Sequence, residues 1–147
     1  SGVGDIGSAV NTFGTVYAVA SSAKYADVAE NYVSDAHYPP GTVVEFGGDY
    51  EVTQAAPDTT RVAGVVSTDP AYLMNSHCVG DAVVAVALTG RVPCRVTGAV
   101  RKGDMMVSAG NGVAKSSANP AMGSVIGKAL GNFEGAEGTI EIVVGRL

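Results

Sequence analysis

Two acidic side chains in the first third of the chain have a spacing that could support proton chemistry. Asp27 and Glu30 stand three positions apart, and in a helix this spacing brings two side chains onto neighbouring positions of one face. Neighbouring carboxylates can share a proton, bind a cation or act as an acid and a base. Two solvated acids on an exposed helix face have the same spacing, and this simpler interpretation is favoured.

Histidine and cysteine add little to this chemistry. Cys78 adjoins His77, but adjacent residues of an extended chain point to opposite sides, which disfavours a reactive pair. The spacing of Ser76 and His77 does not favour a catalytic triad with a distant aspartate. The simpler interpretation, that both are exposed polar loop residues, is favoured. Cys78 and Cys94 occur without a CxxC or HExxH pattern, so no metal site is predicted.

Several large functional classes are disfavoured by what the sequence lacks. It has no Walker loop, no GxGxxG turn between a strand and a helix, and no GxSxG elbow, so no cofactor is predicted. A net charge of −5 disfavours nucleic-acid binding. No stretch reaches the roughly 20 apolar residues that span a bilayer, so no membrane insertion is expected. A conventional enzyme is not indicated, and at most the chain would cut itself once.

The carboxylate pair depends on the element that contains it. Tyr25, Val28, Ala29 and Tyr32 recur at helical spacing, which predicts one short helix near residues 23–33. A helix of about ten residues is not stable alone and would have to dock on the remainder of the domain.

The remainder of the chain is typical of short β-strands joined by turns. Twenty Gly and six Pro indicate many tight turns, and a core without Trp must be built from small aliphatic side chains. The fold class predicted is mainly β, a compact barrel or sandwich-like domain with the one helix. An exposed loop is expected over 71–80, and strands are expected over 16–20, 42–46, 50–53, 61–67, 82–88, 91–96, 105–108, 113–117, 124–130 and 139–146. Gly110-Asn111-Gly112 predicts a hairpin between two of these strands. Within 91–96, Val92, Cys94 and Val96 are expected to share one face, and Pro93 on the other indicates an edge strand or a bulge.

Charge is divided unevenly along the chain. Residues 1–81 carry ten acidic and two basic side chains, a net charge of −8, whereas residues 82–147 carry four acidic and seven basic ones, a net charge of +3. Halves of opposite sign can pack together or alternate across subunit contacts, and chance placement of solvated charges is an equal alternative. The organisation expected is a connecting segment, 1–22, and a β-rich domain, 23–147, with 23–81 and 82–147 as candidate sub-lobes.

Several short sequence segments, taken together and in order, resemble the C-terminal region of tail-fibre and appendage proteins of tailed phages. The resemblance is to phages that infect cyanobacteria and other marine bacteria in particular. The resemblance covers nearly the whole chain. It is carried by DIGS and NTFGTVYA at residues 5–8 and 11–18, KYADVAENY at 24–32, GTVV at 41–44, RVAGVVSTDPAY at 61–72, ALTGRVPCRVTGAVRKGDMMVS at 87–108 and VIGKAL at 125–130.

The resemblance implies a virion structural protein, assembled in the host cytoplasm and working as a homotrimer at the end of a fibre. It is also similar to intramolecular chaperone domains, which trimerise a fibre, guide its folding and in some families cut themselves off. In those families the released piece often starts with Ser. Ser1 fits that pattern, with Asp5, Asp27 and Glu30 as the nearest acids, although the full autoproteolytic signature is not matched and an expression boundary explains Ser1 equally well.

Two other roles stay open at this point. The domain could be a receptor-binding tip that contacts a host surface through polar loop residues, with Asn75, His77, Asn111 and Asn132 as candidates, because loops on a rigid β scaffold commonly carry recognition. It could also decorate a capsid. The expected partners are therefore further copies of this chain, the rest of the fibre and a host receptor.

Overall fold

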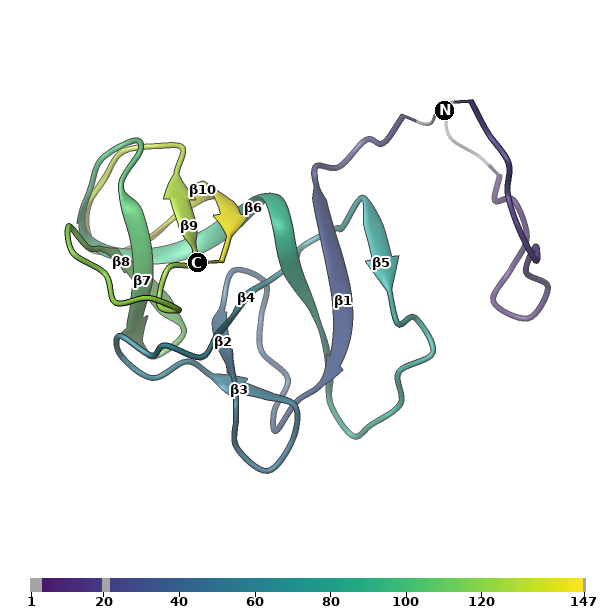
Figure 1. Ribbon diagram of the computed structural model, residues 1–147, viewed down its shortest axis with the longest axis horizontal. Coiled ribbons are helices and arrows are strands. Elements are labelled where there is room, and N and C mark those ends of the chain that lie inside the picture. The colour runs from purple at the N-terminus through teal and green to yellow at the C-terminus, as the bar shows by residue number, and fades with distance from the viewer. Residues whose placement is uncertain (1–3, 20–21, 147) are drawn as a thin grey trace.

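The structure consists of strands and connecting loops. The computed structural model describes residues 4–19 and 22–146, and every regular element within these ranges is a β-strand of one hydrogen-bonded sheet (Figure 1). The prediction of a mainly β domain is confirmed. The strands are β1 (Asp27–Val33), β2 (Val43–Phe46), β3 (Val52–Gln54), β4 (Val62–Val66), β5 (Tyr72–Met74), β6 (Val83–Val100), β7 (Met105–Gly110), β8 (Val113–Ser116), β9 (Gly127–Ala129) and β10 (Phe133–Gly145).

Five of these strands close into a barrel. β6 pairs with β10, β10 with β9, β9 with β7, β7 with β8, and β8 returns to β6. The closing contact is a single parallel pair between Val96 and Ala114. Small side chains suit the narrow interior of such a barrel. The buried residues that fill it include Val92, Cys94, Val96, Val100, Met106, Ala114, Ile126, Ala129, Ile142 and Val144.

β6 links the barrel to the other strands. Its first half pairs with β1 and β4, and its second half pairs with β10 and β8. Val84 and Val86 accordingly pack in a second core with Val44 and Val52, whereas Val92 packs in the barrel core. One continuous strand therefore holds both cores. The division into sub-lobes at 81/82 stays a prediction.

The prediction of a helix near residues 23–33 is wrong. Residues 27–33 form β1, which pairs along its whole length with β6, and residues 28–30 also pair with β5. A helix would satisfy its own backbone but would leave the first half of β6 without a partner on that side. Val28, Tyr32 and Val33 also favour strands. Pairing with neighbouring strands therefore outweighs the helical spacing of the apolar side chains.

Most of the predicted strands are confirmed, with two differences at loops. The expected loop 71–80 contains β5, which adds to the outer side of β1 in parallel. Residues 16–19 form no strand, and Ala20 lies outside the described residues. The hairpin predicted at Gly110–Gly112 is confirmed by the pairing of β7 with β8. The 1–22 connecting segment stays a prediction, and Figure 1 shows residues 4–19 lying away from the strands.

Pro93 was expected on an edge strand or at a bulge, and its backbone position shows why β6 accepts it. The neighbouring amides two residues away, Arg91 N and Arg95 N, donate to Ala26 and Gly41 rather than to β10. The ring nitrogen of Pro93 therefore points to the same side of β6 as these two amides, away from β10. No continuous β-ladder on that side requires an N–H donor at this position. Pro93 keeps its place opposite Glu141 on β10.

Candidate functional site

Asp27, at the start of β1, is one of two buried acids of the described residues, the other being Glu45. The Asp27 side chain is 4 % exposed and accepts a 2.6 Å hydrogen bond from the hydroxyl of Ser67, which is 6 % exposed. Ser67 follows β4, so the contact joins two elements 40 residues apart in sequence. β1 can approach here because residue 90 is Gly: an added Cβ would overlap the carbonyl oxygen of Ala26.

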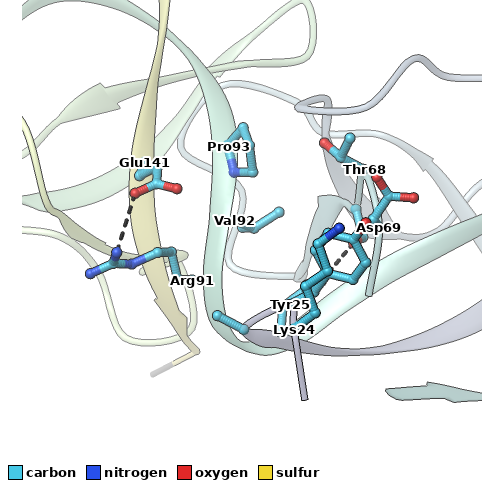
Figure 2. Close-up of a pocket in the computed structure, with 11 residues that line it drawn as sticks. Lys24, Tyr25, Thr68, Asp69, Arg91, Val92, Pro93 and Glu141 are labelled. Atoms are coloured by element: carbon cyan, nitrogen blue, oxygen red, sulfur yellow. Dashed lines mark hydrogen bonds and ion pairs between the residues drawn. The ribbon is translucent and has the colours of Figure 1, made fainter. Parts of the chain in front are cut away.

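A cavity of about 370 Å³ lies beside this pair. Figure 2 shows Arg91 and Glu141 on one side of β6, joined by an ion pair of 3.6 Å. Lys24 and Asp69 lie on the other side. Charges of both signs thus surround the cavity, and its described lining contains no histidine that could activate the Ser67 hydroxyl.

Glu30, the second acid of the predicted pair, lies on the other face of β1. Asp27 and Ala29 are buried on one face, whereas Glu30 accepts a 2.8 Å hydrogen bond from the hydroxyl of Tyr32 on the opposite one. Burial, and then this hydrogen bond to the Glu30 carboxylate, raises the pKa of Tyr32 to about 12. The neighbouring carboxylates that a helix would have produced are therefore not formed.

The remaining candidates for self-processing are separate from β1. Ser1 lies outside the described residues, and Asp5 is exposed in the N-terminal segment. Hydrogen bonds and ion pairs of the described part connect Asp5 to neither Asp27 nor Glu30. The structure thus brings Asp27 together with Ser67 rather than with any of the other acids considered.

The four polar loop residues lie in three separate loops. Asn75 and His77 are exposed after β5, where the Asn75 amide donates to the carbonyl of Asn31. Asn132 accepts from the Lys102 amide before β7, whereas Asn111 lies in the turn after β7. β7 has six residues, so it separates these last two sites by about 20 Å.

Metal and membrane sites receive no support from the described residues. His, Cys, Asp and Glu do not gather there in the groups of three or more that could hold a metal ion. A helix able to span a membrane is likewise absent from the residues that the structure describes.

Most charges of the two halves are not neutralised by each other within the chain. Five ion pairs occur among the described residues, and only Lys115–Asp58 joins residues 1–81 to residues 82–147. Three others connect β10 with β6 or with the residue directly after β6, and their basic side chains are Arg91, Arg95 and Arg101. The acidic first half therefore leaves most of its charge unpaired by the basic second half.

The N-terminal segment exposes an unusual set of apolar side chains. Its six large ones are between 62 % and 108 % exposed: Ile6, Val10, Phe13, Val16, Tyr17 and Val19. A reciprocal pair of backbone hydrogen bonds between Ser8 and Asn11 holds a turn within the segment. Single exposed apolar residues are common on protein surfaces, but six large ones within residues 6–19 make the segment a candidate interaction surface.

Sequence reasoning missed Ser67 and this use of the N-terminal segment. Ser67 follows a Val-rich strand and belongs to no motif, so its contact with Asp27 depends on strand pairing alone. The segment did carry a signal: Ile6 and Phe13 stand among Gly, Ser and Asn residues, in a stretch where no strand or helix was expected.

The comparisons with known proteins support the fold. The structure is similar to the N base of the head fiber protein gp8.5 of bacteriophage phi29, with a TM-score of 0.50 and 17 % sequence identity; the match covers 80 % of this chain and 94 % of that one. No protein-family model and no curated protein matches the chain. A likeness at this identity concerns the fold and leaves function to be argued from surfaces.

Proposed function

We propose that this chain is a structural domain of a phage virion that associates as a homotrimer and ends a fibre. The observation that carries the proposal is the N-terminal segment with its six exposed apolar side chains. The similarity of the fold to a head-fibre base supports a place in a virion, and so does the resemblance of the ordered sequence segments to those of fibre proteins. Association with identical chains is then the work of the domain.

Association has a clear physical benefit. Burying one exposed Val, Phe or Ile side chain contributes about 1.5–3 kcal/mol, and the segment carries several of them. The closed barrel offers a rigid surface to pack against, since its strands have no free edges within the ring. Three copies can therefore gain surface burial that one small domain cannot supply alone.

Light scattering coupled to size exclusion tests the proposal. The expected mass at micromolar concentration is three times the 14.7 kDa of one chain, and dilution should reveal a concentration-dependent equilibrium. A mass of one chain throughout the series would contradict the trimer.

A role in folding or capping the fibre follows from the same association. If the domain trimerises before the preceding part of the fibre folds, it would align the three polypeptide chains of the shaft. Expressing a longer fibre chain with and without this domain tests it: the shortened chain is expected to aggregate, whereas a soluble trimeric shaft without the domain would contradict the role.

The head of the virion is a second candidate location, because the similar protein is named as a head fiber. In that case the domain would be a capsid decoration or head-fibre base. Gold-labelled antibodies against the domain would mark the capsid vertices or faces in electron micrographs. Label confined to the tail would contradict this location.

Receptor binding and self-cleavage have less support. Asn111 and Asn132 lie at opposite ends of β7, about 20 Å apart, which disfavours a single receptor-binding tip that uses both. Asp27 and Glu30 lie on opposite faces of β1, which disfavours an acid–base pair. Blocking of infection by the isolated domain would restore the first role, and cleavage of a longer parent chain that is lost on Asp27→Asn would restore the second.

A further inference from the structure

The barrel has an apolar groove on its outer surface. It encloses about 470 Å³ and is lined by Met105 of β7, Val125, and residues of β9 and β10 that include Gly127 and Val143. Val143 is 41 % exposed and stands on the outward face of β10, next to Glu141, where a solvated barrel would carry a polar residue. The groove is within the size range of sites that bind side chains or small ligands, about 300–1,000 Å³.

The rim of the groove is positively charged. Lys128 and Arg146 line it, and neither forms an ion pair with a described acid. Arg146 is held in place instead, since its guanidinium donates to the carbonyl oxygen of Ala63 at 3.2 Å. The groove therefore suits an apolar segment that also carries an acid.

The N-terminal segment has that chemistry. Ile6, Phe13 and Val16 line one open hollow together with Asp5, and the Ser8–Asn11 turn joins the two arms of this arrangement. The turn constrains the backbone between the two arms before docking, which lowers the entropy lost when the segment binds. Asp5 is the acid of the segment and is exposed.

Segment and groove lie on different sides of one chain. Figure 1 shows residues 4–19 on the right, beyond β5, whereas β9, β10 and the C-terminal end lie on the left. We infer that the N-terminal segment of one copy docks in the β9–β10 groove of a neighbouring copy, with Phe13 against Val143 and Asp5 facing Lys128 and Arg146. This inference rests on the proposed homotrimer and names the surfaces that form it.

The contact is head-to-tail, because it joins two different surfaces of identical chains. Such an interface closes into a ring when the rotation between copies allows it, and three copies would then each give one segment and receive one. It also places Asp5 of one copy beside Lys128 and Arg146 of the next, so opposite charges meet across the interface.

Disulfide trapping between two differently tagged chains tests the inference. One full-length chain carries Phe13→Cys and the other Val143→Cys, both with Cys78→Ser to remove the accessible native thiol. Co-expression and mild oxidation are expected to give about tenfold more of the mixed disulfide than a control pair of Tyr50→Cys with Val143→Cys, since docked side chains have a far higher effective concentration than free chains. Tyr50 is 51 % exposed and lies between β2 and β3, far along the chain from the groove.

The outcomes separate the inference from the proposed function. A trimeric mass with no more trapping than the control overturns segment docking and leaves the trimer intact. A mass of one chain overturns both. A chain with both substitutions that forms only an internal disulfide shows the segment folding onto its own groove, which also overturns the inference. A charge exchange adds a second support: Asp5→Lys should weaken association, and Lys128→Glu with Arg146→Glu should restore it.

Discussion

The α-carbon of Gly127 lies directly against the carbonyl oxygen of Val143, where β9 meets β10. A Cβ added at residue 127 would overlap that oxygen and crowd Val144. The obstruction is backbone, so no side-chain rotation relieves it. We expect Gly127→Ala to separate the two strands and lower the free energy of unfolding by about 1–3 kcal/mol, measured by urea denaturation.

Gly145→Ala is the matched control for this substitution. Gly145 stands on the neighbouring strand, β10, and an added Cβ there meets no atom within 4 Å. Its effect on the free energy of unfolding should stay within about 0.5 kcal/mol. Equal losses in the two variants would show that barrel closure does not depend on the close approach of β9 and β10.

The buried hydrogen bond between Ser67 and Asp27 should be a stabilising link between β4 and β1. Ser67→Ala leaves the Asp27 carboxylate, 4 % exposed, without this donor, and an unsatisfied buried polar group costs about 1–3 kcal/mol. The measurement is a double-mutant cycle with Asp27→Ala. The double variant should lose less than the sum of the two single losses, because both remove the same interaction.

Asp69→Ala serves as the control for this cycle. Asp69 lines the same cavity but is exposed, so its removal should change the free energy of unfolding by no more than about 0.5 kcal/mol. Additive losses from Ser67→Ala and Asp27→Ala would mean that the two side chains do not act together.

The sequence predicted the strands well wherever a turn signal and a local hydrophobic pattern coincide. Gly110, Asn111 and Gly112 all have positive φ angles, the conformation that Gly and Asn tolerate best, and the hairpin was found there. The alternation of Val92, Cys94 and Val96 likewise predicted which side chains fill the barrel. Both signals are local, so the sequence carries them without knowledge of the rest of the fold.

Features that depend on distant strands could not be predicted. The spacing of Tyr25, Val28, Ala29 and Tyr32 fits a helix, and only the need of β6 for a partner makes the segment a strand. The error removed the expected Asp27–Glu30 pair and concealed the contact of Asp27 with Ser67. The closed order of strands that forms the barrel is likewise set by pairings between residues far apart in sequence.

We expect the Tyr32 hydroxyl to lower the free energy of unfolding at high pH. Burial and the Glu30 carboxylate raise its pKa from 10.0 to about 12 in the folded protein, so between these values the unfolded chain releases the Tyr32 proton before the folded one does. The contribution is fully present below pH 10 and is lost as the pH rises through about 12. Urea denaturation at pH 9 and at higher pH should show this fall.

Tyr32→Phe isolates the effect, because the variant retains the aromatic ring. That ring packs edge-on against Phe46, with the two ring centroids 5.5 Å apart. The variant should lack the part of the alkaline destabilisation that Tyr32 causes. The difference in ultraviolet absorbance at the phenolate band between the two proteins should titrate with a midpoint of about 12. A midpoint at 10 would show that Glu30 and burial do not act on this hydroxyl.

The two cysteines should differ sharply in reactivity, because only a thiolate attacks an alkylating reagent. Cys94 is buried in the barrel core, and this burial raises its pKa to about 12, whereas Cys78 is half-buried in the loop after β5. Iodoacetamide at mildly alkaline pH should therefore modify Cys78 in the folded chain and both thiols in urea, as read by mass spectrometry. The Cys78→Ser variant should stay unmodified until it unfolds. Modification of Cys94 in the folded chain, at a rate equal to that of Cys78, would show that the barrel opens far more readily than its closed ring of strands implies.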